Sequence, residues 1–165
     1  MTEQEELYFY FESSIDHLNR AWRILQEIKL HPNHPLVNPA FQFALIEYSK
    51  PYKVSYGAEL DSKGKPRKLL LDKRYIPAKH SALHDRLIRS RDTTHAHDDL
   101  GIKDPAVYVS ATPSGKFVGL GQRVIHGTEE LSNLDLIIDL IEQTISEMCI
   151  ESSRLEALLP INSKI

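Results

Sequence analysis

Two long segments of the chain repeat apolar residues at intervals of three and four positions, a spacing typical of amphipathic helices. In the segment 2–30 the repeat consists of Leu7, Phe11, Ile15, Leu18, Trp22 and Leu25. In the segment that begins near Thr128 it consists of Leu134, Ile137, Ile138, Ile141, Ile145 and Met148. Each stripe needs an apolar surface to pack against, so the sequence predicts helices that share a core.

Two shorter helices are predicted between the long ones. Asn38-Pro39 favours a helix start, because asparagine can cap the first turn and proline fits the first helical position. Pro51 should end this helix, and residues 41–48 are apolar nearly all round, which predicts a central, buried helix. A third helix is expected from 77 to 91. The predicted fold class is therefore mainly α, a four-helix up-down bundle.

The remaining segments are predicted to lie outside the helices. The polar stretch 52–75 is interpreted as a surface insert, mobile or held only by a loose hairpin. Two apolar runs flank Thr-Pro-Ser-Gly at 112–115, which predicts a β-hairpin over 106–120. Residues 160–165 are expected to be a frayed tail. With no repeat and no second core, residues 1–165 are predicted to form one domain.

The composition limits the class of protein. Lys and Arg number 20 against 23 Asp and Glu, which argues against a strongly basic nucleic-acid coat but leaves room for a small basic site. The one cysteine, Cys149, has apolar neighbours, so we expect a buried thiol in a reducing compartment. The acidic start is unlike a secretory signal, and no apolar run approaches the ~18 residues of a membrane span. A cytoplasmic protein without a membrane partner is expected.

The segment 89–99 holds two arginines, two histidines and three acids in eleven residues. Histidine can move a proton near neutral pH, and arginine can clamp a phosphate. In a straight helix Arg91 and His97 would point roughly 120° apart, so they converge only if the helix ends or bends between them. The β-branched pair Thr93-Thr94 favours such a break. Alternatively, the same residues cap the carbonyl groups at the end of the helix.

The segment 87–99 resembles the signature of HEPN-type domains, in which Arg-Asp-x4-His stands at the end of a helix. The residues that fall on its positions are Arg91, Asp92, Ala96, His97 and Asp99. The motif covers about nine residues, and the predicted order of four helices is consistent with the family. Neither the insert at 52–75 nor the hairpin at 106–120 is required by it. The resemblance implies a single HEPN-like helical domain.

The resemblance also implies a function. Many HEPN domains are metal-independent endoribonucleases that work as dimers without a cofactor, with the motifs of both copies lining one cleft. His97 would deprotonate the ribose 2′-hydroxyl or protonate the leaving oxygen, Arg91 would stabilise the phosphate, and Asp92 would orient one of them. His95 and Asp99 would have secondary roles. The alternative is a non-catalytic interaction or dimerisation module, in which the motif braces the helix end.

A metal site is a weaker interpretation of the histidines. His84-Asp85 and His97-Asp98 are His-Asp pairs of the kind found in helical phosphohydrolases, but thirteen positions between them are too few for that pattern. Residues 95, 97, 98 and 99 point apart and rarely chelate together. His80 and His84 share a helix face, interpreted as a solvated one because the glutamate of His-Glu-x-x-His is absent. No metal is expected.

Two further features concern partners. Arg67, Lys68, Lys73 and Arg74 have tyrosines nearby, a composition that suits an RNA-contacting loop and equally any exposed loop. The consecutive aromatic residues 8–10 exceed what one helical stripe needs. Surplus apolar surface marks an interface, so a homodimer is predicted.

Overall fold

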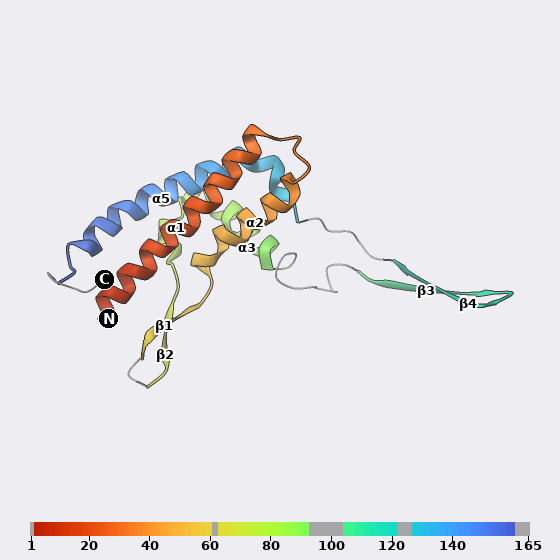
Figure 1. The fold of residues 1–165 in the computed structure, drawn as a ribbon, viewed down its shortest axis with the longest axis horizontal. Coiled ribbons are helices and arrows are strands. Elements are labelled where there is room, and N and C mark those ends of the chain that lie inside the picture. The colour runs from red at the N-terminus through yellow and green to blue at the C-terminus, as the bar shows by residue number, and fades with distance from the viewer. Residues whose placement is uncertain (1, 61–62, 93–103, 122–126, 161–165) are drawn as a thin grey trace.

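The computed structural model describes residues 2–60, 63–92, 104–121 and 127–160 (Figure 1). Its helices are α1 (Glu3–Leu30), α2 (Val37–Ser49), α3 (Ser81–Ser90) and α5 (Leu134–Glu156). Its strands are β1 (Ser55–Leu60), β2 (Pro66–Leu69), β3 (Ala106–Thr112) and β4 (Gly115–Gly121). Short 3-10 turns are η1 (Lys50–Tyr52), η2 (Lys73–Tyr75), η3 (Ala78–His80) and η5 (Glu129–Asn133). The prediction of a mainly helical fold is confirmed.

Helix α1 begins with a capping box. The Thr2 hydroxyl accepts a hydrogen bond from the Glu5 N–H at 3.2 Å, and the Glu5 carboxylate accepts one from the Thr2 N–H at 2.6 Å. These bonds satisfy N–H groups that the first helical turn leaves unpaired. The helix ends at Leu30, just before the prolines at 32 and 35, which cannot continue it.

The core lies where α1 packs between α2 and α5 (Figure 1). The most deeply buried apolar side chains are Leu18, Leu25, Phe41, Leu45, Tyr48, Leu87, Ile137, Leu140, Ile141 and Met148. They come from the four α-helices of the described residues, and those of α1 and α5, except Leu140, belong to the two apolar stripes. Burying one such side chain contributes ~1.5–3 kcal/mol to the stability of the fold. The packing of the two stripes therefore fixes where the attached elements lie.

Three expectations about the helices are wrong. Helix α2 begins at Val37 with Leu36 in the capping position, so Asn38 is not its cap, and Phe43 remains 53% exposed. Cys149 is exposed, although Met148 before it is buried. Adjacent helical residues point ~100° apart, so an apolar neighbour in sequence does not predict burial.

The insert is anchored to the helices at its base. β1 and β2 pair antiparallel, and the Ala58 N–H donates to the Glu6 carboxylate of α1 at 2.5 Å. Gly57 permits this approach, because a Cβ there would lie 2.5 Å from Glu6 Oε1. Tyr52 and Leu71 are buried in the core. The expectation that only its own hairpin holds the insert is therefore wrong.

The second hairpin, β3–β4, projects away from the helices (Figure 1). Its register pairs Val107 with Leu120 and Val109 with Val118, so these four side chains share one face. All four are exposed, from 57% at Val118 to 83% at Leu120. The predicted hairpin at 106–120 is confirmed. With β1–β2, which corresponds to the loose hairpin expected in the insert, the described residues contain two hairpins.

Candidate functional site

The Arg/His segment is described only as far as Asp92. Helix α3 ends at Ser90, and Arg91 and Asp92 follow in a π-helical turn. His95, His97 and Asp99 lie outside the described residues. The structure therefore locates the arginine and the first acid of the motif, while the convergence of Arg91 with His97 stays a prediction.

Asp92 holds two cations. Lys53 Nζ lies 2.5 Å from Asp92 Oδ2, and Arg91 Nη1 lies 3.1 Å from Asp92 Oδ1. Burial acts to raise the pKa of Asp92, but the hydrogen bonds from Lys53 and Arg91 outweigh it and lower the pKa below its usual value. Because Lys53 and Arg91 share the single negative charge of Asp92, the three side chains together carry a net positive charge.

Arg91 has an unused hydrogen-bond donor. Its side chain is 25% exposed, but its Nε is buried and has no partner among the described residues. A guanidinium offers five donors, and a bidentate anion uses two of them in parallel. A buried donor without a partner costs free energy, so this atom indicates where an anion would be stabilised.

Arg91 lines a pocket of about 520 Å³ between the N-terminal half of α1 and the chain from Lys50 to Ala58. Lys50, Lys53 and His17 line the same pocket. Its apolar wall includes Phe9, Tyr10, Val54 and Tyr56. The pocket thus combines three cationic side chains and one imidazole with aromatic surface, the groups that hold a phosphate beside a base. The Glu6 carboxylate also lines it and offsets part of this positive charge.

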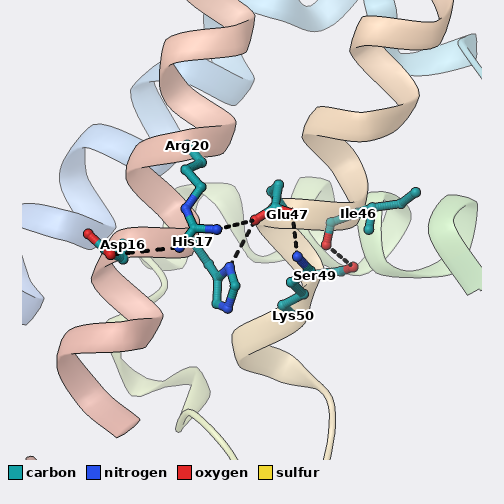
Figure 2. Close-up of polar contacts among 7 residues, drawn as sticks. All are labelled: Asp16, His17, Arg20, Ile46, Glu47, Ser49 and Lys50. Atoms are coloured by element: carbon teal, nitrogen blue, oxygen red, sulfur yellow. Dashed lines mark hydrogen bonds and ion pairs between the residues drawn. The ribbon is translucent and has the colours of Figure 1, made fainter. Parts of the chain in front are cut away.

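A buried carboxylate lies behind the pocket. Glu47 of α2 is only 2% exposed, and Figure 2 shows His17, Arg20 and Lys50 arranged around it. His17 Nδ1 lies 2.8 Å from Glu47 Oε2, Arg20 Nη1 lies 3.9 Å from the same oxygen, and Lys50 bonds the other oxygen. Burial acts to raise the pKa of Glu47, but the hydrogen bonds from Lys50 and His17 lower it overall. Glu47 is therefore an ionised, acceptor-only carboxylate.

His17 and Glu47 were missed by the sequence reasoning, although one signal for them exists. Glu47 is the only charged residue within α2. A carboxylate in an apolar helix must be paired or exposed, since an unpaired buried charge is too costly. Its partner His17 is on another helix, 30 positions away in sequence, so the pattern of residues within α2 could not identify it.

The prediction that His80 and His84 lie on a solvated face is wrong, because both are buried. His84 Nδ1 lies 2.7 Å from the Tyr48 hydroxyl, and its ring packs edge-on against Tyr52. His80 Nε2 lies 2.8 Å from Asp139 of α5. Both histidines therefore brace α3 against the neighbouring elements.

The basic residues of the insert are mostly paired with acids. Arg67 lies 3.0 Å from Glu3, Lys73 lies 2.9 Å from Asp85, and Arg74 lies 3.3 Å from Glu151. Arg67 and Lys68 belong to β2, whereas Lys73 and Arg74 belong to η2. Lys68 is exposed opposite Tyr56, its partner across the hairpin and a pocket residue. This pair links the predicted RNA-contacting residues to the pocket, as does Arg67, whose Nη1 lies 3.9 Å from Oε2 of the pocket residue Glu6.

The predicted surplus of aromatic residues on α1 reduces to one side chain. Phe9 is 63% exposed, whereas Tyr8 is half-buried and the Tyr10 hydroxyl donates to the Pro51 carbonyl at 2.9 Å. Phe9 lines the pocket, so its exposure is explained without an interface.

The described part of the chain contains neither a cluster suited to a metal ion nor a helix suited to a membrane. Among residues 2–60, 63–92, 104–121 and 127–160, no group of three or more His, Cys, Asp or Glu is placed to hold a metal ion. None of the helices described combines the length and apolar character needed to cross a bilayer. Comparison with protein family models, curated proteins and solved structures finds no match for the chain.

Proposed function

We propose that this chain is a metal-independent endoribonuclease of HEPN type, with Arg91 and His97 at its centre. The observation that carries the proposal is the placement of Arg91. Its guanidinium lines a pocket together with Lys50 and Lys53, shares Asp92 with Lys53, and has a buried Nε without a hydrogen-bond partner among the described residues. The resemblance of residues 87–99 to the HEPN signature supplies the reaction class.

In this proposal the phosphodiester lies against Arg91 and Lys53. The planar guanidinium donates to two phosphate oxygens and stabilises the charge that builds up in the transition state. Asp92 fixes the direction of the guanidinium, and His97 moves one proton of the reaction. An RNA base would stack on Tyr56, and Lys68 beside it would contact the next phosphate. A second copy of the chain would complete the cleft.

The test is cleavage of a panel of end-labelled RNAs in the presence of EDTA. The wild type should cleave, because no step uses a metal. Arg91→Lys should lower the rate by ~10²–10³, since lysine keeps the charge but loses the fork. Arg86→Lys is the matched control, because Arg86 is on α3, the helix that leads into Arg91, but pairs with Glu130 outside the pocket. A wild type that leaves every RNA intact would overturn the proposal.

The second candidate is a non-catalytic dimerisation module, and the β3–β4 hairpin favours it. A two-stranded ribbon is marginally stable alone, yet this one exposes Val107, Val109, Val118 and Leu120 on one face. An identical ribbon from a second copy, related by a two-fold axis, would cover that face. Contiguous exposed apolar surface of this kind is typical of an interaction site.

Light scattering at tens of micromolar tests this candidate. The wild type should be dimeric, and Val109→Lys with Val118→Lys should shift it towards monomer. Thr112→Lys, at the turn end of the same hairpin, is the matched control. A monomeric wild type would contradict both the module and a cleft shared between two copies.

A further inference from the structure

His17 is bound to its carboxylate in a way that fixes its tautomer. Glu47 is ionised and can only accept hydrogen bonds. The 2.8 Å contact to Glu47 Oε2 therefore places a proton on His17 Nδ1. In the neutral ring, the other nitrogen, Nε2, then carries a free lone pair and is a proton acceptor.

The orientation of the ring is fixed as well. Glu47 is buried and is also bonded by Lys50 and contacted by Arg20, so the carboxylate cannot turn away (Figure 2). The His17 side chain keeps 26% exposure, and it lines the pocket that Arg91 and Lys53 also line. With Nδ1 held by Glu47, Nε2 is the ring nitrogen left without a hydrogen-bond partner among the described residues.

We propose that His17 is the general base of the phosphodiester cleavage, with Glu47 as its positioning residue. This inference rests on the proposed ribonuclease function and assigns the proton transfer within it. His17 Nε2 takes the proton of the ribose 2′-hydroxyl as the 2′-oxygen forms a bond to phosphorus. The bond from phosphorus to the 5′-oxygen breaks, and that oxygen receives a proton from an acid. The products are a 2′,3′-cyclic phosphate and a 5′-hydroxyl.

The division of roles follows from this proton balance. One group must accept a proton while another donates one. With His17 as the base, the acid role goes to His97, the histidine of the proposed function. Base and acid can be separated experimentally, because a leaving group that needs no proton makes the acid dispensable but not the base.

The experiment compares two RNAs of one sequence that the wild type cleaves. One is natural, and the other has a sulfur in place of the bridging 5′-oxygen at the scissile bond, which leaves as a thiolate without protonation. His17→Ala should slow cleavage of both RNAs by ~10²–10⁴, whereas His97→Ala should slow only the natural one. His17→Asn is measured in parallel, because its amide nitrogen takes the place of Nδ1 and can still donate to Glu47 and keep the fold. His31→Ala, an exposed histidine at the end of α1, is the control.

Each result decides the assignment. Slow cleavage of both RNAs by a folded His17 variant supports the base role. A His17 variant that cleaves both at the wild-type rate overturns it and leaves the proposed function standing. A His17 variant that recovers on the sulfur substrate would be the acid, which also overturns the assignment. A wild type that cleaves neither RNA overturns the function and the base role together.

Discussion

Two adjacent residues of α2 each form a hydrogen bond with a histidine. One of these histidines is partly exposed, and the other is buried. Glu47 holds His17 at the wall of an open pocket, while Tyr48 holds His84 inside the core, where it is 1% exposed. Burial, and to a lesser extent the charge of Lys73, lower the pKa of His84 to about 4, and Asp85 only partly opposes them. The hydrogen-bond partner alone therefore does not make a histidine able to exchange a proton with a bound molecule. Access to solvent and substrate decides it.

Replacing each histidine by alanine should affect stability very differently. His84→Ala should lower the free energy of unfolding by ~2–4 kcal/mol, because it leaves a cavity and an unbonded Tyr48 hydroxyl. His17→Ala should cost about 1 kcal/mol or less, because Glu47 keeps Lys50 and the space opens to solvent. Urea unfolding at pH 7 measures both. Equal losses would show that His17 is also a core residue.

The free energy of unfolding should depend on pH through His84. The folded pKa of His84, about 4, lies below the ordinary unfolded value of ~6.5, so the unfolded chain binds more protons between these values. Stability is therefore lost as the pH falls through this window, by about 2 kcal/mol between pH 7 and pH 5.

Urea unfolding of the wild type and His84→Gln at both pH values isolates this contribution, because other titrating groups cancel in the difference. His31→Gln serves as the exposed control and should keep the wild-type dependence. An unchanged pH dependence in His84→Gln would mean that His84 is not a buried neutral ring.

The smallest expected effect on stability is the difference between replacing Tyr48 and replacing Tyr52, the two tyrosines whose rings contact His84. The Tyr48 hydroxyl is bonded to His84, whereas the Tyr52 hydroxyl is buried and has no partner among the residues described. Tyr48→Phe should cost about 1 kcal/mol. Tyr52→Phe should be neutral or stabilising, since it removes a buried polar group that is not satisfied. Thermal unfolding of the two variants is sufficient, and the reverse order would contradict the hydrogen bonding described.

The parts of the fold that sequence predicted are those with a local signal. The stripes of α1 and α5 and the turn of β3–β4 depend on spacing within one segment. The burial of His80 and His84 had a signal that was overlooked, because with Leu83 and Leu87 they form an i, i+3, i+4, i+7 stripe. Side chains on this stripe face the core, whatever their polarity.

The candidate site was predictable only in part. Arg91 was found from its motif, and it lines a pocket. Lys53, His17 and Glu47 come from three other places in the sequence, and only the packing of α1 against α2 and the insert brings them together. No local pattern encodes such contacts. The anchoring of the insert likewise depends on Glu6, which meets it across 52 positions.

The most direct measurement of the central claim is the chemistry of the RNA ends after incubation with the wild type in EDTA. Attack by the 2′-hydroxyl predicts fragments that end in a 2′,3′-cyclic phosphate and begin with a 5′-hydroxyl, identified by mass spectrometry. His97→Ala should yield neither fragment while remaining folded. Fragments with 3′-hydroxyl and 5′-phosphate ends would indicate attack by water and contradict the account. Intact RNA, together with an unfolded His97→Ala variant, would leave the motif as a brace for the helix end and favour the dimerisation module.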